Sequence, residues 1–187
     1  MDILIVLEDS NGKIHRMGLE SIAGAQHLAS SLGLQASAVV MGANADVLAN
    51  EASQFDLNEV IKIKNDLLST YSSDGYAEAI KQIIDNESPS YILFGHSYQV
   101  RDYVPKLSAK LMKPFLADSI ALKIDGQTVS ATKQMFNAKL FSDVSPSTET
   151  PYLISFQSAA YSTDNITSGS TTIKDYDVSL DTSMIKT

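Results

Sequence analysis

The stretch Ile3-Leu4-Ile5-Val6-Leu7 is a short, continuous apolar run that is rich in β-branched residues. Such a run is typical of a strand buried on both faces, as the strands of parallel sheets are. A turn signal follows at Asn11-Gly12. Apolar residues then recur at helical spacing, at Leu19, Ile22, Ala25, Ala29 and Leu32, before a helix-ending glycine at position 33. The N-terminal segment therefore predicts a buried strand followed by an amphipathic helix.

The same alternation of an apolar run and a helical segment recurs three more times along the chain. Further strands are expected at Ala36 to Met41, Glu59 to Lys64 and Ser90 to Gly95. Further helices are expected over Asp46 to Gln54, over the apolar face from Tyr76 to Ile84, and around Val104, Leu107 and Leu111. Asn44 and Asp74 are the expected N-caps of the first two of these helices. Four strand–helix repeats predict an open sheet of mainly parallel strands.

The helix after the fourth strand contains Pro105, and its expected start depends on that residue. Proline costs little in the first helical turn, because those N–H groups have no intrahelical partner. A start near Asp102 would therefore tolerate Pro105. A start at Ser97 would place the proline in the helix interior, where a kink is expected.

The pattern changes after Pro114, where apolar and polar residues begin to alternate. Asp125-Gly126 separates two alternating runs, which predicts a hairpin with a type I′ turn. One more buried strand is expected at Tyr152 to Phe156, and a weaker one within Thr171 to Leu180. The predicted fold class is α/β: a three-layer open sheet, mostly parallel, with an antiparallel hairpin extension.

Composition narrows the function classes. The 187 residues fit one domain, and 44% hydrophobic residues argue for a sizeable core. A net charge of −8 with only two arginines argues against a nucleic-acid partner. The chain has no cysteine, which fits a reducing compartment, and no apolar run long enough to insert in a membrane. We expect a soluble, acidic, intracellular domain.

Motifs that carry chemistry are mostly absent. Neither G-x-G-x-x-G nor G-x-x-x-x-G-K-[ST] occurs, so both common phosphate cradles are missing. No G-x-S-x-G nucleophile motif is present. The histidines His15, His27 and His96 lie on different expected elements without metal-binding spacing. The sequence predicts no catalytic residue and no metal site.

One cluster of polar residues follows the fourth strand: Gly95, His96, Ser97, Arg101 and Asp102. Ligands of open α/β sheets usually bind beyond the carboxyl ends of the strands, and a helix N-terminus attracts anions. These residues are therefore a candidate anion or nucleotide pocket, or a docking surface. The alternative is that Ser97 or Asp102 caps the helix while Arg101 pairs with a nearby acid, which is the more common role of such residues.

Four segments also carry a family pattern: Asp2 to Glu8 followed by Asn11-Gly12-Lys13, Tyr91 to Ser97, Arg101 to Leu111, and Ala117-Asp118-Ser119. Over residues 1–160 this diffuse pattern resembles the N-terminal domain of the electron-transfer flavoprotein alpha subunit. The resemblance implies a Rossmann-like fold of the adenine-nucleotide-hydrolase-like type. Residues 161–187 would then be a linker or peripheral strand leading to a flavin domain that this chain does not contain.

The chain departs from the family at two places. Lys133-Gln134 and Asn137 replace an Arg-Pro pair that leads to a glycine, and Gln157-Ser158 replaces a second Arg-Pro pair. The family's glycine-rich, arginine-containing flavin motif does not occur in the sequence. No cofactor-binding residue is therefore transferred from the family, and we expect no cofactor in this domain.

The resemblance implies a scaffold without its own active site. Such a scaffold pairs with a beta subunit in a complex that holds FAD. The complex would carry electrons from dehydrogenases, such as acyl-CoA dehydrogenases in fatty acid β-oxidation, to a quinone oxidoreductase of the respiratory chain. The compartment would be a bacterial cytoplasm or the mitochondrial matrix.

Two other functions remain open from the residues alone. One is a stand-alone nucleotide-binding module of the same α/β superfamily, which would use Gly95 to Ser97. The other is a small hydrolase acting through His96 and Asp102.

A partner surface is expected between Ile120 and Phe156. There Met135, Phe136, Leu140 and Phe141 follow neither a helical nor a strand period. Exposed apolar patches mark partner sites, and a homodimer reusing the same surface is also possible. The alternative is that these side chains fold back onto the domain's own core.

Overall fold

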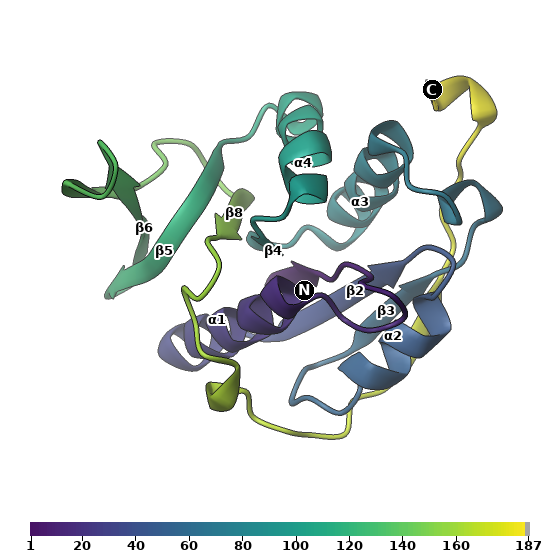
Figure 1. Cartoon of the computed structure of the whole chain (residues 1–187), viewed down its shortest axis with the longest axis horizontal. Coiled ribbons are helices and arrows are strands. Elements are labelled where there is room, and N and C mark those ends of the chain that lie inside the picture. The colour runs from purple at the N-terminus through teal and green to yellow at the C-terminus, as the bar shows by residue number, and fades with distance from the viewer. Residues whose placement is uncertain (186–187) are drawn as a thin grey trace.

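The computed structural model describes residues 1–185 as nine strands and four α-helices (Figure 1). The helices are α1 Arg16–Leu32, α2 Ala45–Ala52, α3 Ser73–Glu87 and α4 Tyr98–Leu111. The strands are β1 Ile3–Val6, β2 Ala36–Met41, β3 Val60–Ile63, β4 Tyr91–Gly95, β5 Phe115–Asp125, β6 Thr128–Met135, β7 Leu140–Val144, β8 Tyr152–Phe156 and β9 Ile173–Tyr176.

All nine strands form one sheet in the order β7-β6-β5-β8-β4-β1-β2-β3-β9. Only the β5–β6 and β6–β7 pairs are antiparallel. The sequence-based fold class is therefore confirmed: a mostly parallel open sheet with an antiparallel extension. The third strand of that extension, β7, was not expected.

The buried strand β1 explains why the sheet has a helical layer on each face. Ile3 and Ile5 point into a core formed with α1 and α2, while Leu4 and Val6 point into a second core formed with α3 and α4. Figure 1 shows the two helix pairs on opposite sides of the sheet. A strand that alternates between two cores must be apolar throughout, as this run is.

Of the two expected N-caps, Asp74 was wrong, and Asn44 is confirmed in position but not in its hydrogen bond. Ser72, not Asp74, caps α3, because its hydroxyl accepts a hydrogen bond of 3.2 Å from the Gly75 N–H. Asn44 occupies the N-cap position of α2, but its side chain makes no capping hydrogen bond and donates to Asp9 instead, at 2.7 Å. In both cases a contact outside the helix competes for the polar side chain.

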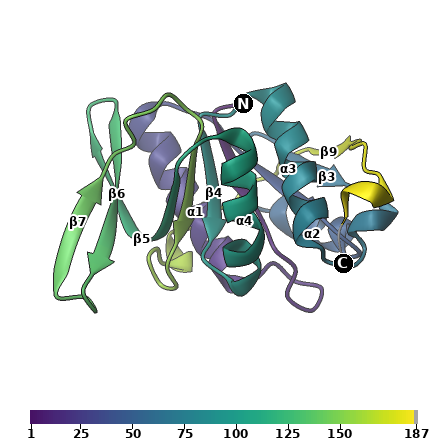
Figure 2. The same cartoon turned by 90° about the horizontal axis from the view of Figure 1, so that it is seen from above.

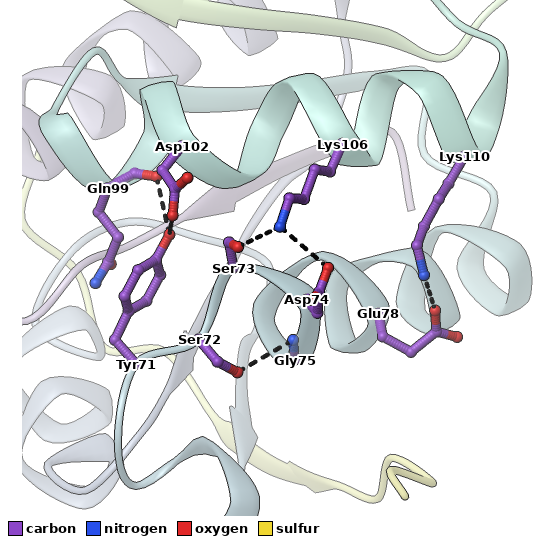
Figure 3. Close-up of polar contacts among 10 residues, drawn as sticks. All are labelled: Tyr71, Ser72, Ser73, Asp74, Gly75, Glu78, Gln99, Asp102, Lys106 and Lys110. Atoms are coloured by element: carbon purple, nitrogen blue, oxygen red, sulfur yellow. Dashed lines mark hydrogen bonds and ion pairs between the residues drawn. The ribbon is translucent and has the colours of Figure 1, made fainter. Parts of the chain in front are cut away.

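Helix α4 begins at Tyr98 with Ser97 as its N-cap, which agrees with the second of the two starts considered, so Pro105 lies in the helix interior. Contacts with α3 hold this helix in place after the proline (Figure 3). Lys106 donates to Ser73 at 2.6 Å and to Asp74 at 3.1 Å. Lys110 pairs with Glu78 at 2.5 Å. These contacts offset part of the cost of an interior proline.

The expected hairpin joins β5 and β6, but its turn differs in type. Asp125 pairs with Thr128, which leaves Gly126 and Gln127 as the central residues. Of these two, only Gly126 adopts a positive φ, of 57°. A type I′ turn needs a positive φ at both central residues, so that prediction was wrong. Glycine at the first central position fits a type II′ turn instead.

The turn between β6 and β7 is strained. Phe136, Asn137 and Ala138 are consecutive non-glycine residues with φ of 53°, 57° and 61°. The left-handed region costs an ordinary L-residue roughly 1–2 kcal/mol. Phe136 is nevertheless 71% exposed, so no burial of its ring compensates the cost.

The C-terminal part of the chain completes the sheet. Strand β9 pairs in parallel with β3, with Ile173 opposite Val60. Just before it, the Thr171 hydroxyl donates to the carbonyls of Phe55 and Leu57, at 2.7 and 3.0 Å. This strand lies within the expected strand at Thr171 to Leu180. The division at residue 160 stays a proposal, and positions 186–187 of the second part fall outside the described residues.

No helix within residues 1–185 is both long enough and apolar enough to cross a membrane.

We predict that Ala138→Gly raises the free energy of unfolding by about 1 kcal/mol, because glycine adopts the left-handed region without the Cβ penalty. Urea denaturation measures the change. Ala121→Gly, in strand β5, is the control and should lower stability, because glycine weakens a strand interior. A loss of stability in Ala138→Gly similar to that of the control would contradict the strained turn.

Candidate functional site

The sheet changes its direction of winding between β1 and β4. From β1 the chain continues to β2 and β3 on one side, whereas β4 and then β5 to β8 lie on the other side. Such a switch point is where open α/β sheets bind ligands. A cavity of about 580 Å³ opens here, and its lining includes Glu8, His96, Ser97 and Arg101.

Gly95, at the end of β4, allows helix α1 to pack closely against this strand. A Cβ at this position would lie 2.5 Å from the Cβ of Met17, in the first turn of α1. Only glycine permits this approach of α1 to the end of β4. Gly95 itself does not line the cavity, so its role in the structure is packing.

Ser97 joins two elements across the switch point. Its hydroxyl accepts a hydrogen bond of 3.1 Å from the Val100 N–H, which caps α4. It also donates to the Glu8 carboxylate at 2.5 Å. The capping interpretation is therefore confirmed for Ser97. Its hydroxyl both accepts a hydrogen bond, from Val100, and donates one, to Glu8.

Glu8 follows β1 and points its carboxylate toward this hydroxyl. Burial raises the pKa of Glu8 above its usual value, and the hydrogen bond from Ser97 and the charge of His15 oppose the rise. Because burial is the largest of these effects, keeping the Glu8 carboxyl ionised at neutral pH lowers the stability of the folded protein.

His96 lies in a second hydrogen-bonded group. Its Nδ1 lies 2.8 Å from the Ser155 hydroxyl, and its Nε2 lies 3.9 Å from an Asp118 carboxylate oxygen. Burial lowers the pKa of His96, although Asp118 opposes the change. Ser155 is fully buried and accepts a hydrogen bond from the Asp118 N–H at 3.1 Å. Because Ser155 is buried, this Ser–His–Asp arrangement does not present the serine hydroxyl to solvent.

Arg101 and Asp102 point to different neighbours. The Arg101 guanidinium lies over the Tyr98 ring, 5.5 Å from its centroid, so its contact is aromatic and not the expected acid. Asp102 accepts a hydrogen bond of 2.6 Å from the Tyr71 hydroxyl, on the side facing α3 (Figure 3). Asp102 does not line the cavity, and the structure does not pair it with His96. The expected grouping for a hydrolase is therefore not formed.

Sequence reasoning missed Asp118 and His15 as members of this region. Asp118 adopts a φ of 58° at an irregularity in the pairing of β5 with β8. Its segment was noted only for the family pattern, and nothing in that pattern places it beside His96. His15 caps α1 through its ring, whose Nδ1 accepts from the Met17 N–H at 3.2 Å. Histidine is not among the preferred N-caps, so the usual cap rule does not find it.

The charges around the cavity do not favour a phosphate. Glu8, Asp9 and Asp118 contribute carboxylates, against the single guanidinium of Arg101. In the described part of the chain, no three histidine or acidic side chains come close enough together to hold a metal ion. The arrangement links β1, β4, α1 and α4 at the switch point.

We predict that Glu8→Gln raises the free energy of unfolding at pH 7. A carboxyl whose pKa is higher in the folded state destabilises the fold once the pH exceeds its unfolded value. The gain should therefore shrink toward zero as the pH falls below about 4. Denaturant titrations across this pH range measure it.

Glu78→Gln is the control of opposite sign, because the hydrogen bond from Lys110 lowers the pKa of Glu78. This variant should lose stability at neutral pH, and its loss should vanish in acid. A loss of stability in Glu8→Gln at pH 7 would show that Glu8 is stabilising as an anion.

Comparison with known proteins gives a consistent result. Residues 3–181 match the family model described as "Electron transfer flavoprotein domain". An electron transfer flavoprotein subunit alpha from Thermoanaerobacterium thermosaccharolyticum is 35% identical over 124 residues, which are 66% of this chain and 38% of that protein. The subunit of the same name from Bacillus subtilis is 25% identical over 95% of this chain and 54% of its own length.

A third relative carries a different name. The protein named "Acryloyl-CoA reductase electron transfer subunit beta" from Anaerotignum propionicum is 28% identical over 66% of this chain and 34% of its own length. The chain thus spans between 34% and 54% of the length of these three relatives.

Proposed function

Because the chain belongs to the electron transfer flavoprotein domain family, we propose that it is a scaffold domain of the alpha-subunit type. In this proposal the domain has no active site of its own and pairs with a beta subunit. The complete complex holds FAD and carries electrons between redox partners. The observation that carries the proposal is the match of residues 3–181 to this family, together with the two relatives named alpha subunits.

The electron donors, the acceptor and the compartment that we propose are those of the family. The electron donors are dehydrogenases such as acyl-CoA dehydrogenases, and the acceptor is a quinone oxidoreductase. The place of action is a bacterial cytoplasm or the mitochondrial matrix. The relative whose name refers to an acryloyl-CoA reductase supports a CoA-linked donor or acceptor.

Two structural features support a scaffold. At the switch point, the polar side chains bind one another: Ser97 engages Glu8, and His96 engages Ser155. At the hairpin, Phe136, Leu140 and Phe141 are each more than half exposed, so the expected apolar surface is present and these side chains do not fold back onto the core. Exposed apolar groups on a rigid sheet suit association with another chain.

One observation favours the second candidate, a stand-alone nucleotide-binding module. The cavity of about 580 Å³ lies at the switch point and includes Arg101 and the exposed ring of Tyr98. An aromatic ring and a guanidinium suit a base and a phosphate. Glu8 and Asp9 in the same cavity oppose an anion, which is why the scaffold is the preferred proposal.

We predict that the purified chain is colourless, has no flavin absorbance and gives no heat of binding when AMP is titrated in a calorimeter. The reason is the absence of a phosphate cradle and the acidic lining of the cavity. Flavin absorbance would contradict the scaffold proposal. AMP binding that is lost in Arg101→Ala but kept in the control Arg16→Ala would establish the nucleotide-binding module instead.

A further inference from the structure

Residues 162–183, which we call the strap, lie on the surface of the domain after β8. They include β9, which pairs with β3 at the side of the sheet away from β7 (Figure 2). None of the residues from 162 to 183 is buried. Tyr176, Val178 and Leu180 pack against the core formed with α3 and α4, but each stays partly exposed. Polar contacts must therefore contribute much of what holds the strap.

Two glutamine side chains hold the strap by the same arrangement. Gln26, on α1, donates from its Nε2 to the Thr167 carbonyl at 3.0 Å and accepts at its Oε1 from the Thr167 N–H at 2.8 Å. Gln82, on α3, donates to the Ser179 carbonyl at 2.7 Å and accepts from the Ser179 N–H at 2.9 Å. Each amide binds both backbone groups of one residue, as a neighbouring strand does. We call these two contacts the glutamine clamps.

Between the clamps, the strap is bound through its backbone and through surface charges. The Gly169 N–H donates to the Gln54 carbonyl at 2.8 Å, and a Cβ at Gly169 would lie 2.6 Å from the Asp56 Cα. Strand β9 then pairs with β3, and Lys62 of β3 contacts Asp175 of β9 at 2.8 Å. Surface hydrogen bonds and ion pairs of this kind are individually weak.

The two cores of the domain do not need the strap. Within the described chain, every buried residue of both cores lies between Ile3 and Phe156. Segments that bury few apolar groups, and whose backbone hydrogen bonds are exposed, open locally while the rest of a protein stays folded. The strap has these properties along its whole length, so its opening leaves both cores intact.

We propose that the strap is a releasable linker, which the two glutamine clamps hold closed against the domain. In the closed state, β9 covers the edge of β3. In the open state, this edge is uncovered and the strap spans up to about 75 Å when fully extended. The two alternatives from the sequence, a linker and a peripheral strand, then describe its open and closed states. The proposal rests on these contacts alone and does not depend on the electron-transfer function.

Trypsin measures the open population, because Lys174 lies within β9 and a protease needs its substrate strand to be free. When opening and closing are fast, the rate of cleavage follows the population of the open form. Trypsin should therefore cut the wild-type chain after Lys174 before it cuts after Lys62, on the neighbouring strand β3. Mass spectrometry identifies both products.

Loss of either clamp should favour the open state. Gln26→Met and Gln82→Met each remove two hydrogen bonds to the strap and keep a side chain of similar length and helix propensity. Each should speed cleavage after Lys174 about tenfold. Gly169→Ala should speed it as well, because the added Cβ cannot fit against the Asp56 backbone.

Two controls separate release of the strap from other effects. Gln134→Met makes the same substitution on β6, away from the strap, and should leave the rate unchanged. Ile5→Val removes a methylene group from a fully buried position of β1 and lowers the stability of the whole domain. This variant should also leave cleavage after Lys174 unchanged, because Ile5 stays buried when only the strap opens.

Two results would overturn the proposal. If Ile5→Val speeds cleavage after Lys174 as much as the glutamine variants do, the strap opens only when the whole domain unfolds. If neither Gln26→Met nor Gln82→Met speeds this cleavage, the clamps do not hold the strap closed.

Discussion

The hydrogen bond from Ser97 to Glu8 fixes the carboxyl end of the sheet, and the rest of the domain depends on it. It ties the start of α4 to the end of β1 at the point where the sheet changes its winding. Gly95 makes the same junction compact by allowing Met17 to approach β4. Glu8 and Ser97 thus bind each other in the lining of the cavity at the switch point. A rigid junction of this kind suits a scaffold.

The hairpin extension of the sheet, unlike the switch point, leaves groups without partners inside the domain. Strand β9 closes the sheet beside β3, while the β5–β6–β7 extension ends in an uncovered strand. The strained turn at Phe136 to Ala138 precedes that strand and presents an exposed ring. Strain that is not compensated within a domain is often associated with function. The capacity for interaction therefore lies in the hairpin extension, away from the switch point.

The parallel part of the fold was predictable because its signals are local. Strand β1 is apolar throughout, since it lies between two cores, and the spacing from Leu19 to Leu32 could only suit a helix. Strand β7 was missed because both of its faces are largely exposed: the adjacent residues Leu140 and Phe141 point to opposite faces and are each more than half exposed, so no alternation of apolar and polar residues marks the strand. Asp74 was expected to cap α3, but it lies in the first helical turn and accepts from Lys106, which is distant in sequence. Asn44 takes the expected cap position of α2, but its side chain donates to the distant Asp9. For the site, Ser97 was found from its place after a strand. Its partner Glu8 and the contribution of Asp118 depend on tertiary packing that no local pattern reveals.

The central claim is that this domain works by associating with another flavoprotein subunit and not by binding a ligand of its own. The most direct test is to co-express the chain with an electron transfer flavoprotein beta subunit and to determine the mass of the purified product by light scattering. We expect a one-to-one complex of the two chains. A chain that purifies apart from the beta subunit would contradict it.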